Sequence, residues 1–264
     1  MKLEREEVFH DEWASSIAPE SVLVEETWNA LTSPERRWMK SKLPPLRGKR
    51  VLDLGCGAGE GAVWFAKQGA DVVASDLSAE FLTLVTRVAQ FHQVQVETHH
   101  ANSVHLDLPD ESFDIIYSAN VLHHVESIPE TLQGCKRLLK PGGLLLTTDP
   151  LRYNPVIEVY RRMATKVRTV DEKPVGFELI SQMREQFRKV EFECFWLCSL
   201  WIFLHFYLIE RVHPSCDRYW VKVIREHQRL EKLYRPLARL DHTLLKWVPW
   251  LKRMCWNMAL VAQK

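Results

Sequence analysis

Short apolar segments alternate with longer amphipathic segments through the first 150 residues of the chain. The apolar segments are five or six residues long and rich in Val, Ile and Leu, which is typical of strands buried on both faces of a sheet. The amphipathic segments repeat apolar residues every three or four positions, which predicts helices. The predicted strands are 50–54, 71–76, 94–98, 113–118 and 144–148, and the helices that follow them begin near 62, 79 and 128. This alternation predicts a parallel sheet covered by helices on both faces.

The two flanks of this region follow other patterns. Residues 8–43 repeat large apolar residues at helical spacing and end at Pro44-Pro45, which predicts N-terminal helices. After residue 150, two further helices precede a sixth strand at 189–195, and a long helical stretch precedes a last strand at 256–262. We therefore expect a doubly wound, seven-stranded, mostly parallel α/β sheet. Its expected parts are an N-terminal helical cap (1–45), a core (46–198 and 254–264) and a helical lid inserted before the last strand (199–253).

Composition excludes several classes of protein. The 264 residues are 46% hydrophobic and 26% charged, which is ordinary for a globular protein and argues against disordered or fibrous structure. The acidic start of the chain has no apolar core of the kind that a signal peptide needs. The six cysteines include no Cys-x-x-Cys pair, so we expect reduced thiols in a cytoplasmic protein.

A Gly-rich turn follows the first strand at residues 55–61. Glycines let the backbone bend sharply and approach a ligand, while the N–H groups of the next helix point at its polar parts. Asp76 ends the second strand, where an acid can accept hydrogen bonds from both ribose hydroxyls. The turn by itself does not choose between cofactors, because Gly57-Ala58-Gly59-Glu60-Gly61-Ala62 also fits the dinucleotide pattern G-x-G-x-x-A.

Four motifs in order resemble the class I S-adenosylmethionine-dependent methyltransferases, particularly the small-molecule, type 11-like members. They are Val51–Gly59, which pairs an acid with G-x-G-x-G, the acid Asp76, Phe113–Ile116 with Asn120–Val125, and Leu139–Gly143. The resemblance spans residues 50–148. It implies S-adenosylmethionine as the cofactor in place of NAD.

The resemblance also implies which residues bind the cofactor. Gly55 and Gly57 would cradle its methionine end with Asp53 near the amino group, Asp76 would hold the ribose, and Asn102-Ser103 would face the adenine amine. The full implied set is Asp53, Gly55, Cys56, Gly57, Gly59, Asp76, Leu77, Asn102, Ser103 and Asn120. The sequence departs from the family at Asn102, where Asp is usual, although the Asn carbonyl oxygen can still accept a hydrogen bond.

Methyl transfer needs alignment of nucleophile, carbon and sulfur, and a general base helps when the acceptor is a hydroxyl. The candidates at the carboxyl ends of the fourth and fifth strands are His123, His124, Asp149 and Tyr153. The alternative for the His pair is a role in packing or in the adenosine pocket. We expect Tyr153 and Asn154 to line the acceptor pocket. No metal site is expected, because the adjacent His pairs lack ligand spacing on one helix.

The C-terminal part of the chain is basic. Residues 1–150 carry 14 Lys and Arg against 22 Asp and Glu, whereas residues 151–264 carry 21 against 12. Within the expected lid, Arg218, Lys222, Arg225, Arg229 and Lys232 recur at helical spacing beside an apolar face. Such a stripe is either a solvated face over a packed one or, with six of the ten tryptophans nearby, a contact with an anionic membrane.

The expected function is methylation of a small-molecule acceptor, with oxygen favoured over nitrogen or carbon. A catalytically silent cofactor-binding or partner-activating protein is the first alternative, and a lipid- or quinone-like acceptor at a membrane surface is the second. Nucleic acid is not expected as a partner, because no target-base motif or RNA-binding module is recognised. Arg168 and Glu172 are further residues considered for the acceptor pocket, against the alternative of a solvated loop.

Overall fold

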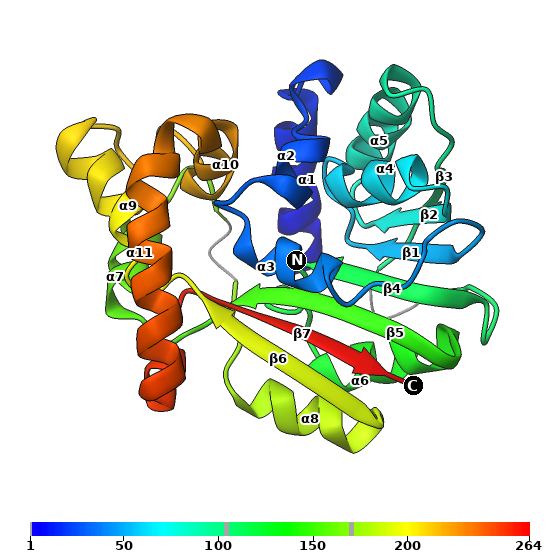
Figure 1. The fold of residues 1–264 in the computed structure, drawn as a ribbon. Coiled ribbons are helices and arrows are strands. Elements are labelled where there is room, and N and C mark those ends of the chain that lie inside the picture. Colours follow the sequence, from blue (N-terminus) through cyan, green and yellow to red (C-terminus); the bar gives the residue numbers. More distant parts are fainter. Residues whose placement is uncertain (1, 103–105, 169–171) are drawn as a thin grey trace.

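Seven strands form one mixed sheet at the centre of the molecule (Figure 1). The structure, a computed structural model, describes residues 2–102, 106–168 and 172–264. The sheet order is β3-β2-β1-β4-β5-β7-β6, with β7 antiparallel to both of its neighbours. The strands are β1 (Arg50–Leu54), β2 (Asp71–Asp76), β3 (Glu97–His100), β4 (Phe113–Ala119), β5 (Leu139–Pro150), β6 (Lys189–Phe195) and β7 (Asn257–Gln263). The predicted doubly wound, mostly parallel sheet is confirmed.

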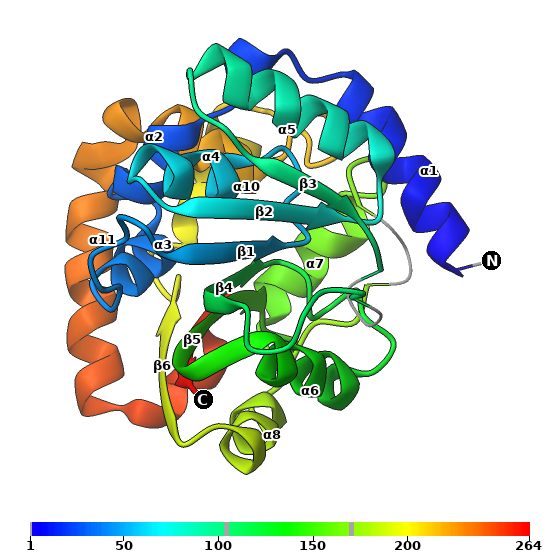
Figure 2. The same cartoon turned by 90° about the vertical axis from the view of Figure 1, so that its right-hand side faces the viewer.

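Helices cover both faces of the sheet. Figure 2 shows α4 and α5 on one side of the strands and α6 and α8 on the other. Before the sheet come α1 (Lys2–Ser15), η1 (Pro19–Ser21), α2 (Val24–Asn29) and α3 (Pro34–Lys40). Between and after the strands come α4 (Glu60–Lys67), α5 (Ala79–Phe91), α6 (Ile128–Leu138), α7 (Pro155–Met163) and α8 (Glu178–Gln186). Because successive residues of a strand point to opposite faces, Val51 packs with α4 and α5 while Leu52 belongs to the core beneath α6 and α8.

Two strands begin three or more residues away from the sequence-based expectation. β3 begins at Glu97 instead of 94, because Val94 and Val96 pack against the core before the chain joins β2. β5 begins at Leu139, so the expected turn at 139–143 lies inside the strand. The pairing of β5 with β4 is irregular at this point. Leu139 pairs with Phe113 but Leu144 pairs with Ile115, so the register between the two strands shifts.

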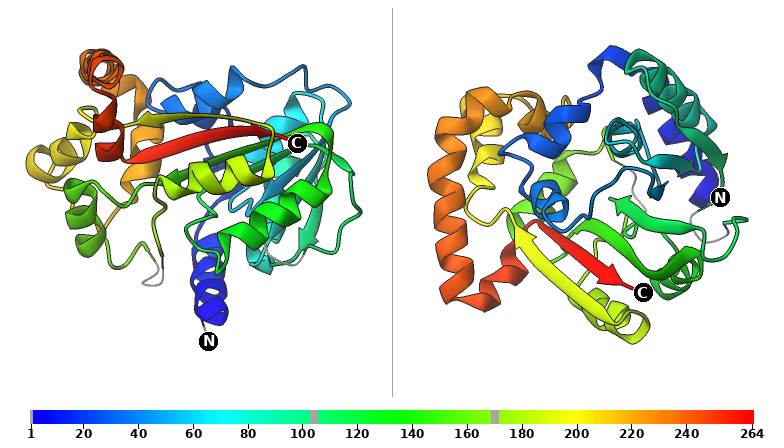
Figure 3. Two further views of the ribbon diagram at one scale, coloured as in Figure 1. Left: turned by 90° about the horizontal axis from the view of Figure 1, so that it is seen from below. Right: turned by 45° about the vertical axis from the view of Figure 1, so that its right-hand side comes forward.

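The segment between β6 and β7 lies beyond the carboxyl ends of the parallel strands. It contains α9 (Trp201–Leu204), the π-helical turn η2 (His205–Ile209), α10 (Tyr219–Arg225), α11 (His227–Trp247) and η3 (Pro249–Met254). These helices gather with α7 at the end of the sheet to which the parallel arrows point (Figures 1 and 3). They share a core of aromatic and aliphatic side chains that includes Trp196, Phe203 and Tyr219. The division into cap, core and lid stays a prediction.

The basic residues of this segment do not form a stripe on one helix. α10 ends at Arg225 and α11 begins at His227, and the chain changes direction between them (Figure 1). The expectation of one continuous helix is therefore corrected. Arg218, the first residue of the expected stripe, lies just before α10 and lines the central cavity.

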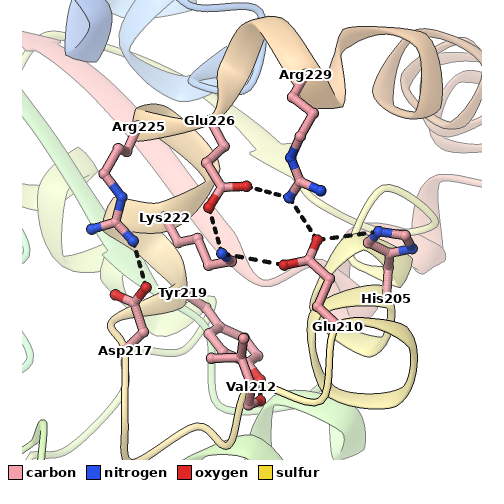
Figure 4. A network of polar contacts seen from close by, with 9 residues as sticks. All are labelled: His205, Glu210, Val212, Asp217, Tyr219, Lys222, Arg225, Glu226 and Arg229. Atoms are coloured by element: carbon pink, nitrogen blue, oxygen red, sulfur yellow. Dashed lines mark hydrogen bonds and ion pairs between the residues drawn. The ribbon is translucent and has the colours of Figure 1, made fainter.

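Three of the remaining basic residues are paired with acids of the same segment (Figure 4). Glu210 lies 3.2 Å from Lys222 and 2.6 Å from Arg229, and Glu226 also pairs with both. Arg225 pairs with Asp217. The basic charges that the sequence placed on a free surface thus serve largely to hold α10, α11 and the end of η2 together.

Trp28 is a central packing residue of the N-terminal helices. It is fully buried and stacks on Trp64 of α4 at a ring distance of 4.1 Å, with Phe65 edge-on at 5.2 Å. We expect Trp28→Ala to lower the free energy of unfolding by about 3–5 kcal/mol, because truncation leaves a large cavity. The matched control is Trp247→Ala, whose side chain is 73% exposed and which we expect to change stability by less than about 0.5 kcal/mol. Denaturant unfolding of both variants measures the difference, and equal losses would contradict this account of α2.

Candidate active site

A cavity of about 670 Å³ lies at the carboxyl ends of the parallel strands. Three parts of the chain form its walls: the Gly-rich turn with the strand ends, the N-terminal helices, and the helices beyond β5. The site is therefore formed by segments that are far apart in the sequence.

The Gly-rich turn is held by the end of β2. The amides of Gly55 and Cys56 donate to the Ser75 carbonyl oxygen at 2.8 and 3.0 Å. The Asp76 carboxylate accepts from the Gly57 amide at 2.9 Å and, through its other oxygen, from the Ser78 amide at 3.0 Å. Because a carboxylate oxygen can accept more than one hydrogen bond, Asp76 keeps acceptor capacity toward the cavity that it lines.

Gly57 leaves room for a ligand. Its φ is +51°, and a Cβ added there would meet no atom within 4 Å. Gly61 shows the opposite constraint, because an added Cβ would lie 2.6 Å from Asp53 Oδ2 and 2.7 Å from the Tyr117 ring. One glycine keeps the cavity open, and the other lets a buried acid approach the start of α4.

Asp53 is a buried acid at the bottom of the cavity. Burial raises the pKa of its carboxyl to about 8, and Oδ2 accepts no hydrogen bond from the described residues. The buried guanidinium of Arg36, on α3, interacts electrostatically with Glu60 and Tyr117. Burial would lower the Arg36 pKa, but Tyr117, Glu35 and Glu60 outweigh it and raise the pKa. An acceptor atom without a donor, beside a buried guanidinium, suits a ligand that carries both an ammonium and a carboxylate group.

His123 and Asp149 form a hydrogen-bonded pair between the ends of β4 and β5. His123 Nδ1 lies 2.8 Å from Asp149 Oδ1, and the Thr147 hydroxyl donates to Asp149 Oδ2 at 3.0 Å. The carboxyl is fully buried behind the ring, which lines the cavity. Burial raises the pKa of Asp149 to about 7, against the lowering effect of its hydrogen bonds. An imidazole held in this way by a carboxylate has a fixed orientation for proton transfer.

His124 and Glu172 extend this pair. The ligand atoms of His123, His124 and Glu172 lie within 4.8 Å of one another, so this group could hold a metal ion. Glu172 already forms an ion pair with Arg168, which neutralises its carboxylate without a metal ion. The expected absence of a metal site stays a prediction.

The other residues predicted to bind the cofactor differ in their positions. Cys56, Leu77, Asn102 and Asn120 line the cavity, and burial raises the pKa of the Cys56 thiol well above its usual range, so it is a neutral part of the wall. Gly59 faces Val85 of α5 instead of the cavity. Ser103 lies outside the described residues.

Tyr153 and Asn154 do not line the cavity. After Pro150 the chain enters the core beneath the sheet, where Tyr153 packs and its hydroxyl accepts from the Phe177 amide at 3.1 Å. Asn154 caps α7 by accepting from the amides of Val156 and Ile157. Both side chains therefore complete local structure, in contrast to the expectation that they contact the acceptor.

Several cavity residues were not indicated by the sequence. On α1, the His10 ring lies 5.9 Å from that of His124 and the Trp13 ring lies 5.3 Å from that of Phe81, so this helix closes one side. Arg36 comes from α3, and Arg161 and Arg218 come from α7 and the start of α10. The helical spacing around Trp13 was visible in the sequence, but no local pattern separates these residues from ordinary helix surface.

Comparison with known proteins identifies a methyltransferase domain within the chain. Residues 52–147 match the family model described as "Methyltransferase domain". The matched segment supports the resemblance to class I S-adenosylmethionine-dependent methyltransferases that the motifs predicted, and with it S-adenosylmethionine as the cofactor.

Individual relatives agree with this class. The ubiquinone biosynthesis O-methyltransferase of Roseobacter denitrificans is 35% identical over 111 residues, which are 42% of this chain and 44% of that protein. Phosphoethanolamine N-methyltransferase 3 of Arabidopsis thaliana is 36% identical over 106 residues, 40% of this chain and 22% of that protein. The chain thus spans less than half the length of these curated relatives.

A solved structure shares the fold over nearly the whole chain. The S-adenosylmethionine-dependent methyltransferase of Mesorhizobium loti is 19% identical with a TM-score of 0.53, and the match covers 94% of this chain and 100% of that one.

Gly57 and Gly48 form a matched pair for testing the cavity. Both have positive φ and open space around an added Cβ, but Gly48 lies in the loop before β1 and Gly57 lines the cavity. We expect Gly57→Ala and Gly48→Ala each to lower stability by about 1 kcal/mol, because alanine is strained at this φ. Only Gly57→Ala should weaken S-adenosylhomocysteine binding, by about tenfold or more, since its methyl group occupies ligand space. Titration calorimetry checks this, and equal affinities for the two variants would place the ligand elsewhere.

Proposed function

We propose that this chain transfers a methyl group from S-adenosylmethionine to an oxygen atom of a small-molecule acceptor. The observation that carries the proposal is the His123–Asp149 pair, whose His123 ring lines the same cavity as the Gly-rich turn while Asp149 is buried behind it. A base in this position is useful for a hydroxyl acceptor, because a hydroxyl must lose its proton as it attacks.

The cofactor end of the cavity suits this donor. In our proposal Asp76 holds the ribose hydroxyls, Leu77 and Asn102 flank the adenine, and the backbone at Gly57 approaches the methionine portion. Asp53 accepts from the amino group, which supplies the donor that Oδ2 lacks. Arg36 lies in the same charge group and pairs with the carboxylate end.

The chemistry needed from the protein is alignment and proton removal. S-adenosylmethionine supplies a methyl group on a sulfonium, from which an aligned nucleophile can displace it directly. With this donor bound, displacement by the acceptor oxygen would leave the S–C electron pair on sulfur, and Nε2 of His123 would take up the hydroxyl proton. Asp149 holds Nδ1 and stabilises the imidazolium that results. α1 and the helices beyond β5 line the cavity and would limit the access of water to this step.

Replacement of His123 tests the proposal. We expect His123→Gln to lower kcat by about 10²- to 10⁴-fold, the usual contribution of a general base, while S-adenosylhomocysteine binding is retained. The exposed His242 on α11 provides the control substitution His242→Gln, which should leave kcat unchanged. Transfer of labelled methyl groups to a panel of catechols and hydroxybenzoates, in the presence of each variant, measures both.

The pH profile gives a second measure of the same pair. Because burial raises the pKa of Asp149 to about 7, the pair takes up a proton as the pH falls below neutrality and cannot then accept another. The kcat of the unmodified chain should therefore rise with pH through about 7 and level off, and this rise should be absent in His123→Gln. A flat profile for the unmodified chain would remove His123 from the mechanism. Cofactor binding without turnover on any acceptor would favour the catalytically silent alternative.

A lipid- or quinone-like acceptor presented at an anionic membrane surface is a second candidate function. No helix in the described ranges is both long and apolar enough to span a bilayer. Several large apolar side chains beyond β6 are nevertheless more than half exposed, among them Trp201, Ile209, Trp247 and Trp250. Aromatic side chains in this setting suit insertion at a lipid interface.

Vesicle co-sedimentation tests this candidate. Membrane contact predicts that the chain sediments with vesicles containing anionic lipid, less so at high salt, and that Trp247→Ala with Trp250→Ala reduces the bound fraction. Equal recovery in the supernatant with anionic and zwitterionic vesicles would remove the candidate.

A further inference from the structure

Arg225 of α10 lines the cavity and pairs with Asp217, and three further arginines line it on the same side, which the helices beyond β5 form. Arg161 lies on α7, Arg168 follows that helix, and Arg218 is the residue before α10. The side chains of Arg161 and Arg168 are only 9% and 13% exposed. Such burial of several guanidinium groups in one wall is unfavourable unless anions compensate it.

The compensation within the protein is incomplete. Arg161 donates to the Leu151 carbonyl oxygen at 3.1 Å and lies 3.5 Å from Glu158, which is half exposed. Arg168 pairs with Glu172. Arg218 lies over the Trp13 ring at 4.0 Å, and its buried Nε has no hydrogen-bond partner among the described residues.

The pKa values of these three arginines are lowered, as expected for buried cations without full compensation. Burial lowers the pKa of all three guanidinium groups, that of Arg168 to about 10, and the charge of Arg161 lowers the Arg168 pKa further. An anion placed among them would relieve both the desolvation and the mutual repulsion.

The arginines are close to the proposed base. Glu172, the partner of Arg168, lies within 4.8 Å of ligand atoms of His123 and His124. Leu151, which accepts from Arg161, is two residues beyond Asp149. A molecule of modest size can therefore reach the arginines and His123 together.

Aromatic side chains form part of the remaining surface on this side of the cavity, beside aliphatic ones. Trp13, Tyr160 and Trp220 line it, and the Tyr160 and Trp220 rings lie 6.5 Å apart, edge to face. Flat apolar walls of this kind bind an aromatic or similarly flat body.

We propose that the acceptor is a hydroxylated aromatic compound that carries an oxyanion, either a carboxylate or a phosphate. The oxyanion binds among Arg161, Arg168 and Arg218, the ring lies against Trp13 and Trp220, and the hydroxyl faces His123. This inference rests on the proposed methyl transfer and narrows its substrate class. Guanidinium groups recognise both kinds of oxyanion through paired hydrogen bonds, so the two sources are separated by experiment.

The test compares charged and neutral members of matched pairs. With the chain saturated with S-adenosylhomocysteine, calorimetry measures binding of 3,4-dihydroxybenzoate against 3,4-dihydroxybenzamide, salicylate against salicylamide, and phenyl phosphate against phenol. We expect the charged member of at least one pair to bind about tenfold or more tightly than the neutral one, since hydrogen bonds to charged groups contribute this much. The carboxylate and phosphate pairs show which oxyanion is preferred.

Arginine variants locate the effect. Arg218→Gln, which removes a charge without removing a hydrogen bond of the described structure, should reduce the charged-to-neutral affinity ratio at least threefold, and so should Arg168→Gln. The control is Arg235→Gln on the outer side of α11, where Arg235 pairs with the exposed Glu231, and its ratio should not change. S-adenosylhomocysteine affinity should stay the same in all three variants, which also reports that they fold.

Two results would overturn the inference. One is that no acid binds better than its neutral partner, including the case in which no member of any pair binds at all. The other is a preference for acids that survives both Arg168→Gln and Arg218→Gln. Failure of the chain to bind S-adenosylhomocysteine is a different result, because it contradicts the proposed function itself.

Discussion

The carboxyl ends of β1, β2, β4 and β5 meet at one edge of the sheet, and this constraint of parallel pairing organises the rest of the molecule. It brings Asp53 and Asp76 beside the Gly-rich turn and Asp149 beside His123, although Asp53 and Asp149 lie 96 positions apart in the sequence. A parallel sheet has no other place where polar groups from several buried strands can reach a common space. The N-terminal helices and the segment beyond β6 then cover that edge, which turns an open crevice into a cavity.

The covering segments depend on buried polar contacts as much as on apolar packing. Glu35 of α3 is buried, pairs with Arg36 and accepts from the Trp196 indole at 3.2 Å, which ties the N-terminal helices to the end of β6. Asp241 of α11 accepts from the amides of Leu197 and Ser199, so the long helix is anchored where the chain leaves the sheet. These contacts fix how the cover sits over the strand ends, and thus how large the cavity is.

Sequence reasoning predicted the parts of the fold that follow local rules. The predicted bounds of β1, β2 and β6 match, because each is a short apolar run with clear flanks, whereas β3 is displaced, since this edge strand is largely exposed and the apolar run precedes it. At the site, the Gly-rich turn, Asp76 and His123 were visible because neighbouring residues form a motif. Arg36, Arg161 and Arg218 were not, because what distinguishes them is burial against distant segments. Tyr153 was predicted to line the acceptor pocket because it follows β5. Its place in the sequence does not reveal that its side chain points into the core beneath the sheet.

The place of β7 in the sheet has a consequence for how the chain acquires its structure. β7 lies between β5 and β6 and pairs with both along seven residues, yet residues 196–256 separate it from β6 in the chain. During synthesis β6 therefore has no neighbour in the sheet until the whole intervening helical segment has been made. In that interval both edges of a strand rich in Phe and Val carry unpaired backbone groups, the kind of exposed template on which other chains pair. β6 carries charged residues at Lys189, Glu191 and Glu193. Charges of this kind discourage pairing with other chains before β7 has been made.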